Sequence, residues 1–248
     1  MSVDFSANLG FLWKERPFLE RIAAAKAAGF PFVEFHDHAQ DEDPPAVREA
    51  LAGTPVVGLN VRHHDCNGLA ALEGREADAS ADIAEAAATA KAIGAGAVHV
   101  MSGRNAGPGG ADRLAARLTE ATATFPDLTF LIEPICDQAV PGYFLNTLEE
   151  AADILAKVGR ANAKIMFDCF HVQRAGGDLL ARYKTHKEMV GHIQIAGGLT
   201  RAEPDRGEIN YPWLIPALQD AGYGGSFGAE YNPSGPVEAH LSWRDAYR

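Results

Sequence analysis

Cysteine is scarce in this sequence and long hydrophobic runs are missing, which argues against disulfide-stapled and membrane-spanning proteins. Cys66, Cys136 and Cys169 are too few and too irregularly spaced for a disulfide framework or a cysteine-rich metal site. No stretch approaches the ~18 apolar residues that a membrane-spanning helix needs. The N-terminus also lacks the basic segment and following apolar segment of a secretory signal peptide. We therefore expect a cytoplasmic protein with no membrane partner.

Positive charge is scarce as well. The chain has 22 lysine and arginine residues against 33 aspartate and glutamate residues, so its formal net charge at pH 7 is −11. This balance argues against a nucleic-acid partner, because nucleic-acid-binding surfaces are basic. A small anionic substrate would need a locally positive site, supplied by a metal ion or by arginines.

Strand-like and helix-like segments alternate along the 248 residues. Strands are expected at 3–8, 32–35, 55–61, 97–101, 128–132, 164–168, 190–195 and 226–229. Helices are expected at 17–29, after Asp43, and at 75–93, 112–125, 147–158, 178–187 and 211–221. Eight strands in this alternation predict an α/β protein with one domain over residues 1–248, a single (β/α)8 TIM barrel. The alternative is an open Rossmann-type sheet, but the chain lacks the Gly-x-Gly-x-x-Gly turn of that fold after its first strand.

Four of the expected strands end in a side chain that carries oxygen. The four apolar runs are followed by Glu133, Asp168, Gln194 and Glu230. In a barrel the carboxyl ends of the strands form the active-site face, so we expect these four side chains to converge. Any one of them alone is equally well explained as a helix N-cap or a surface residue. Four in the same position favour a shared site.

Three carboxylates and an amide oxygen form a hard ligand set that is typical of Mg²⁺ or Mn²⁺. Without a cation, the carboxylates would repel one another strongly. We therefore predict a divalent metal held by Glu133, Asp168, Gln194 and Glu230. Glu133 and Glu230 are also the predicted catalytic pair. Proton transfer next to a carbonyl needs positioned acid and base groups, and the metal would polarise the carbonyl.

Two further residues are predicted to contact the substrate. His171 follows Asp168 by three residues, in an expected loop, and Arg201 lies in the long loop 196–210, where it could clamp a carboxylate or hydroxyl. The alternative for both is an ordinary solvated side chain. Other polar residues are expected at the same mouth without a defined role: Glu34, His36, His63 and His64. His99 is expected to be buried and hydrogen-bonded, and Cys169 to pack in the core rather than act as a nucleophile.

Several stretches resemble the hydroxypyruvate isomerase family of the xylose isomerase-like barrel superfamily. They are Val98-His-Val-Met-Ser-Gly, Phe167-Asp-Cys-Phe-His, His192-Ile-Gln-Ile-Ala-Gly, Glu203-Pro-Asp-Arg-Gly-Glu-Ile-Asn-Tyr-Pro-Trp and Gly228-Ala-Glu-Tyr-Asn-Pro. The resemblance covers nearly the whole chain. It implies the same catalytic pair, metal ligands and substrate contacts as above. It also implies a reaction that interconverts hydroxypyruvate and tartronate semialdehyde through an enediolate.

The resemblance leaves the exact substrate open. A close branch of the family isomerises four-carbon 2-oxo acids, and the loops at 62–68 and 200–204 depart from the family pattern. The partner is therefore expected to be a small hydroxy-oxo acid or a sugar. The alternatives are a ketose 3-epimerase, a DNA-repair endonuclease, which would need a basic groove and additional metal-binding histidines, and a sugar-acid binding protein without turnover. Barrels of this superfamily commonly associate, so a homo-oligomer is considered, although the sequence indicates no interface.

Overall fold

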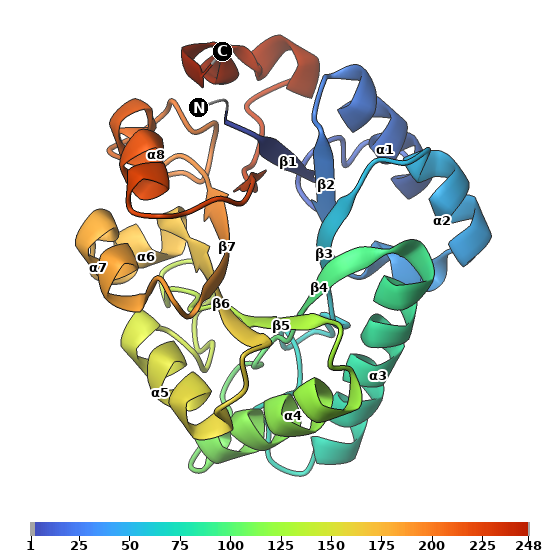
Figure 1. Cartoon of the computed structure of the whole chain (residues 1–248), viewed down its shortest axis with the longest axis vertical. Coiled ribbons are helices and arrows are strands. Elements are labelled where there is room, and N and C mark those ends of the chain that lie inside the picture. The colour runs from blue at the N-terminus through green and yellow to red at the C-terminus, as the bar shows by residue number, and fades with distance from the viewer. Residues whose placement is uncertain (1–2, 248) are drawn as a thin grey trace.

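The computed structural model describes residues 3–247, and its eight strands form one closed barrel (Figure 1). Each strand pairs in parallel with its neighbours in sequence, and β1 pairs with β8 to close the ring. The strands are β1 (Phe5–Asn8), β2 (Phe32–Phe35), β3 (Val56–Asn60), β4 (Ala95–His99), β5 (Thr129–Ile132), β6 (Ala163–Asp168), β7 (Val190–Ile195) and β8 (Phe227–Ala229). The predicted (β/α)8 TIM barrel is confirmed.

Helices surround the ring of strands (Figure 1). Local sequence explains several of their boundaries. Pro44 begins α2, where a proline ring removes no intrahelical hydrogen bond, and Thr147 and Glu150 form the predicted capping box of α5. The helices are α1 (Phe18–Ala27), α2 (Pro44–Leu51), α3 (Glu76–Ile93), α4 (Gly110–Thr124), α5 (Leu148–Val158), α6 (Cys169–Ala175), α7 (Leu179–His186) and α8 (Tyr211–Asp220), with 3₁₀ helices at Asp37–Asp41, Val237–His240 and Ser242–Tyr247.

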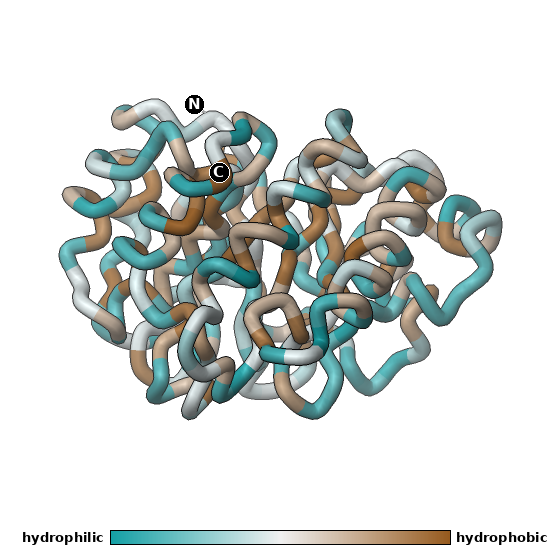
Figure 2. The backbone as a smooth tube through the Cα atoms, turned by 90° about the horizontal axis from the view of Figure 1, so that it is seen from below, coloured by the Kyte–Doolittle hydropathy of each residue, from teal (hydrophilic) through white to brown (hydrophobic). Residues whose placement is uncertain are grey.

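The main hydrophobic core lies between the strands and the helices. Hydrophobic segments gather inside the molecule, and hydrophilic segments lie mainly on the outlying loops (Figure 2). A separate small cluster consists of Ala97, Leu131 and Met166 on three adjacent strands. Successive side chains of a strand point to opposite faces, so these three share the inner face of the barrel, whereas their neighbours Val98 and Phe130 pack in the outer core.

The same alternation places the strand-end acids. Glu133 follows Leu131 by two residues and Asp168 follows Met166 by two, so both continue the inward-facing rows of their strands. On β7 and β8 the inward rows include Gln194 and continue to Glu230. The sequence therefore directs the predicted residues into the barrel mouth through strand period alone.

One local expectation was wrong. The segment after β6 is not a loop, because α6 begins directly at Cys169 and includes His171. Asp168 is the N-cap of this helix, and its Oδ1 accepts a hydrogen bond from the backbone N–H of Phe170 at 2.8 Å. The N-cap role and a site role can coexist, because the other carboxylate oxygen, Oδ2, accepts a hydrogen bond from Arg201 instead. Within residues 3–247, no helix has the length and apolar character required to span a membrane.

Candidate active site

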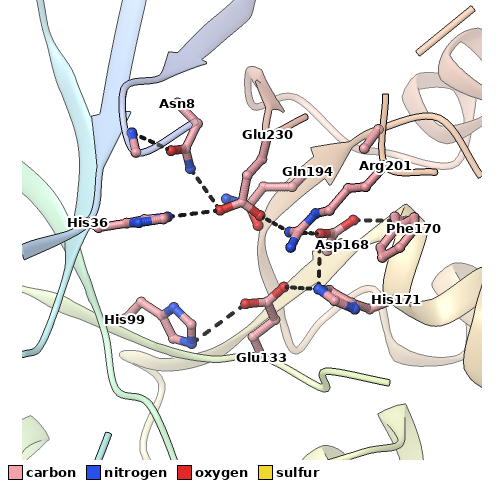
Figure 3. Close-up of polar contacts among 12 residues, drawn as sticks. Asn8, His36, His99, Glu133, Asp168, Phe170, His171, Gln194, Arg201 and Glu230 are labelled. Carbon is pink, nitrogen blue, oxygen red and sulfur yellow. Dashed lines mark hydrogen bonds and ion pairs between the residues drawn. The ribbon is translucent and has the colours of Figure 1, made fainter. Parts of the chain in front are cut away.

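A cavity of about 380 Å³ lies at the carboxyl ends of the strands. Four predicted site residues line it, namely Glu133, His171, Arg201 and Glu230. They come from the ends of β5 and β8, from α6 and from the loop after β7, and Figure 3 shows that their polar groups point toward one another. Asp168 and Gln194 do not line this cavity themselves, but they lie beside these groups in the same view.

The three carboxylates are almost fully buried. Glu133 is 4% exposed, Asp168 1% and Glu230 5%. Burial and the charges of Glu230 and Asp168 raise the pKa of Glu133 well above its usual range. Burial also raises the pKa of Asp168, to about 6, although Arg201 opposes this shift. The pKa of Glu230 is raised by burial in the same way, against Arg201. Ionising these three buried carboxylates together therefore costs free energy, and a bound cation would lower that cost.

Arg201 supplies the positive charge within this group. Its Nη2 donates to Oδ2 of Asp168 at 2.9 Å and also donates to Oε2 of Glu230. The guanidinium lies over the ring of Phe11 at 4.6 Å and over the ring of Phe170 at 5.3 Å from the centroids. Contact with two aromatic faces favours the charge of the guanidinium. The prediction that Arg201 lies at the mouth is confirmed, whereas its contact with the two acids was not expected.

His171 is buried, and its ring nitrogens have different surroundings. Nδ1 lies 3.4 Å from the backbone N–H of Cys136, which donates to it. Burial and the charge of Arg201 lower the pKa of His171 well below its usual value, so the ring is neutral. With Nδ1 as acceptor, the proton resides on Nε2. Nε2 faces Glu133 and Asp168, each at 3.7 Å, and is therefore placed as a donor toward the site.

Gln194 is oriented by its own hydrogen bond. Its Nε2 donates to Oε1 of Glu34 at 2.7 Å. Its Oε1 is buried and has no hydrogen-bond partner among residues 3–247, and the same is true of Oε1 of Glu133. Buried polar atoms in folded proteins are normally paired. These two unpaired oxygens are therefore suited to bind a ligand such as a cation.

The donor set fits a divalent cation. Potential ligand atoms of Glu133, Asp168 and His171 lie within 4.8 Å of one another, and all three residues are buried. With its proton on Nε2, His171 adds a hydrogen-bond donor beside the two carboxylates and not a ligand. The unpaired oxygens of Glu133 and Gln194 add to the excess of acceptors. Carboxylate and amide oxygens suit Mg²⁺ or Mn²⁺. The four-residue set of Glu133, Asp168, Gln194 and Glu230 stays a prediction, as do the roles of the catalytic pair.

The histidines near the mouth differ in position. His36 and His63 line the cavity, and Nε2 of His36 lies 3.3 Å from Oε1 of Glu230. His64 instead contacts Asp82 on α3 at 2.6 Å and is absent from the cavity wall. His99 is buried as expected. Its Nε2 lies 3.8 Å from Oε2 of Glu133 and has no hydrogen-bond partner among residues 3–247, so the expected hydrogen bond is wrong for this nitrogen.

Asn8 is a site residue that the sequence interpretation missed. Its Nδ2 donates to Glu230 at 2.9 Å and to Glu34 at 3.2 Å. The signal that could have found it is strand period, because Ser6 and Asn8 occupy the inward row of β1.

Cys169 is fully buried and burial raises its thiol pKa well above the usual value, as expected of a packing residue.

Comparisons with known proteins cover almost the whole chain. The model of the xylose isomerase-like TIM barrel family matches residues 22–247. The 2-oxo-tetronate isomerase of Cupriavidus necator is 40% identical, with 98% of each chain aligned. The hydroxypyruvate isomerase of Escherichia coli is 33% identical over 98% of this chain and 99% of its own. The crystal structure of AP endonuclease, family 2, from Brucella melitensis superposes with a TM-score of 0.95 at 34% identity and covers 100% of both chains.

Proposed function

Because the chain belongs to the hydroxypyruvate isomerase family of xylose isomerase-like TIM barrels and is an isomerase of the aldose–ketose type, we propose that it interconverts hydroxypyruvate and tartronate semialdehyde. The observation that carries this proposal is the pair Glu133 and Glu230, which face one cavity from different sides (Figure 3). Such a pair can remove a proton from one carbon and deliver a proton to its neighbour.

The surroundings of the two glutamates suggest different roles. Glu230 accepts hydrogen bonds from Arg201 and Asn8, and both favour its ionised form. We assign it the removal of the proton from C3 of hydroxypyruvate. Glu133 has a more strongly raised pKa and an unpaired Oε1. Glu133 would deliver a proton to C2, the proton of the C3 hydroxyl would pass to the oxygen on C2, and exchange with solvent would then return both glutamates to their starting protonation states.

Two residues would hold the substrate oxygens. Nε2–H of His171 is aimed at the centre of the site and would donate to an oxygen that gains negative charge. Arg201 would bind the substrate carboxylate in a charge-assisted contact. Residues Glu133, Asp168, Gln194 and Glu230 would hold a divalent metal, Mg²⁺ or Mn²⁺. When bound, such a cation polarises the carbonyl and lowers the energy of the enediolate.

A four-carbon 2-oxo acid is the second candidate substrate. The relative from Cupriavidus necator, 40% identical, is named 2-oxo-tetronate isomerase. The cavity of about 380 Å³ also leaves room for a carbon beyond the three of hydroxypyruvate. An endonuclease role is not favoured, because the net charge of −11 opposes binding to a phosphate backbone.

The test is a proton-exchange assay in D2O followed by NMR. Metal-stripped protein is given hydroxypyruvate, then Mn²⁺, and the four-carbon acid is tested in parallel. We expect isomerisation of at least one acid that requires the metal. If neither acid reacts but a free ketose does, the proposal is wrong and the epimerase alternative replaces it. Binding of metal and acid without any turnover would favour the binding-protein alternative.

A further inference from the structure

Glu34 is a buried carboxylate that does not line the 380 Å³ cavity, but it shares the donor Asn8 with Glu230 of the cavity wall. The side chain lies on β2, and Glu34 is 4% exposed. It accepts four side-chain hydrogen bonds, from Oγ of Ser6 at 2.7 Å, Nδ2 of Asn8 at 3.2 Å, Nε2 of His192 at 2.7 Å and Nε2 of Gln194 at 2.7 Å. These four donors come from β1 and β7, so one carboxylate connects the inner rows of strands that are not adjacent to one another.

The bond to Gln194 selects one orientation of its amide. An ionised carboxylate only accepts hydrogen bonds, so it requires the NH2 end of the amide on its own side. The carbonyl oxygen of Gln194 is then turned away from Glu34. That oxygen is the buried, unpaired Oε1 already described. A flipped amide would place an NH2 group, which cannot bind a cation, in the same position.

The bond to Asn8 acts in the same way on Glu230. Nδ2 of Asn8 donates to Glu34 and to Glu230, while its Oδ1 accepts the backbone N–H of Gly10 at 2.9 Å. All three contacts agree on a single orientation of the Asn8 amide. Glu34 therefore contacts one predicted metal ligand, Gln194, directly, and it reaches a second, Glu230, through Asn8.

The surroundings keep Glu34 ionised and in place. Each of its two oxygens takes two side-chain hydrogen bonds, Oε1 from Asn8 and Gln194 and Oε2 from Ser6 and His192. Such contacts favour the charged form of a carboxylate. The backbone leaves room for this arrangement at Gly228. A Cβ there would lie 2.6 Å from Oε1 of Glu34 and 2.8 Å from Cγ of Gln194.

We propose that Glu34 is a positioning residue that sets the donor atoms of the divalent-cation site, because it turns the carbonyl oxygen of Gln194 and the NH2 group of Asn8 toward that site. This inference rests on the proposed metal-dependent function. It assigns Glu34 no contact with substrate or metal.

The experiment measures Mn²⁺ affinity of the metal-stripped, full-length protein by calorimetry and by EPR. Glu34→Met keeps the length of the side chain and removes both acceptors, and we expect it to weaken Mn²⁺ binding ~10-fold or more, as measured for residues that orient metal ligands. Glu34→Gln is equally neutral but keeps one oxygen that accepts from Gln194. It should retain most of the affinity. Equal losses in the two variants would mean that Glu34 acts only through its charge, and the proposal would be overturned.

Ser6→Ala is the matched control. Ser6 donates to Oε2 of Glu34, whereas Gln194 donates to Oε1, so the orientation of Gln194 should survive and Mn²⁺ affinity should stay within ~2-fold of the wild type. Melting temperatures are recorded for every variant. If Glu34→Met does not fold, the double variant with Glu34→Gln and Gln194→Glu is measured in its place. It restores an amide–carboxylate pair with an oxygen toward the site, and it should bind Mn²⁺ at least as well as the wild type.

The outcomes separate this inference from the proposed function. A wild-type protein that binds no Mn²⁺ contradicts the proposed function itself. In that case the side-chain amide signals of Gln194 and Asn8 in NMR still test the positioning, because both should lose protection from solvent exchange in Glu34→Met. A wild-type protein that binds Mn²⁺ while Glu34→Met binds it equally well contradicts only the role of Glu34.

Discussion

Arg201 places its Nη2 nitrogen against Oε2 of Glu230, one of the residues predicted to bind a divalent cation. The same nitrogen donates to Asp168. The guanidinium and a metal therefore compete for the same two carboxylates. If a cation binds there, Arg201 gives up at least one of these bonds and becomes available for another anion. Phe11 and Phe170 would hold it within the cavity through their ring faces.

The first prediction concerns the loss of this guanidinium. Arg201→Met removes the competing charge, so we expect Mn²⁺ to bind several-fold more tightly, while KM for the 2-oxo acid rises ~10-fold or more because a charge-assisted contact is lost. Calorimetry and steady-state kinetics measure the two effects. Arg206→Met is the control, because Arg206 lies in the same loop but is exposed and outside the cavity wall. A fall in Mn²⁺ affinity in Arg201→Met would contradict the competition.

The second prediction separates the two glutamates. Glu133→Gln and Glu230→Gln should each lower kcat by ~10²- to 10⁴-fold, the usual effect of removing a general acid or base. Exchange in D2O should distinguish them. Glu133→Gln should still exchange the C3 protons of hydroxypyruvate, because Glu230 remains, whereas Glu230→Gln should not. If Glu230→Gln exchanges the C3 protons and Glu133→Gln does not, the two roles are exchanged. If either variant keeps full activity, the substituted glutamate does not belong to the catalytic pair. Mn²⁺ affinity is measured in both variants to exclude simple loss of the metal.

Strand period explains how much of this site the sequence predicts. Glu133, Asp168 and Gln194 stand at the ends of apolar runs, and the two-residue repeat of a strand directs them inward. The alternation of strands and helices predicts the barrel, and the two-residue repeat predicts that the acids converge at its carboxyl end. Both patterns can be recognised in the sequence alone. The two-residue repeat also places Asn8 on an inner row, which the interpretation of the sequence did not use. Glu34 was expected at the mouth without a defined role, and it lies on an inner row but outside the cavity wall.

The remaining contacts depend on long-range geometry. Arg201 adopts a left-handed backbone conformation, with φ of 54°, in a long loop, and nothing in the local sequence indicates that it bonds Asp168 and Glu230. His171 lies in α6 because Asp168 caps that helix, which a search for a loop after β6 overlooks. Glu34 and His192 are 158 residues apart in sequence. Their pairing exists only because the barrel closes between β8 and β1.

The third prediction concerns pH. Burial raises the pKa of Asp168 in the metal-free protein to about 6, above the value of 3.8 expected when it is exposed. Because the folded-state pKa is the higher one, this carboxyl stabilises the metal-free fold below about pH 4, and that contribution is lost as pH rises through 6. A metal that binds the ionised form must displace a proton below pH 6.

We therefore expect Mn²⁺ affinity to rise between pH 5 and about pH 7 and then to level off, and the increase in melting temperature caused by Mn²⁺ to grow over the same interval. Calorimetry and thermal unfolding at a series of pH values measure both. Asp168→Asn should abolish most of the binding and the pH dependence with it. An affinity that is constant from pH 5 to pH 7 would show that Asp168 is already ionised in the metal-free protein or does not bind the metal.

The fourth prediction tests the space beside Glu34. In Gly228→Ala the new Cβ would lie 2.6 Å from Oε1 of Glu34, so the carboxylate must move. We expect a loss of ~1–3 kcal/mol in the free energy of unfolding, typical of an overpacked interior, together with weaker Mn²⁺ binding, because Gln194 follows Glu34. Gly224→Ala is the control, since no atom lies within 4 Å of its added Cβ. If Gly228→Ala unfolds like the wild type but binds Mn²⁺ poorly, the strain is confined to the site. If it loses stability and keeps its Mn²⁺ affinity, Gln194 does not depend on the exact position of Glu34.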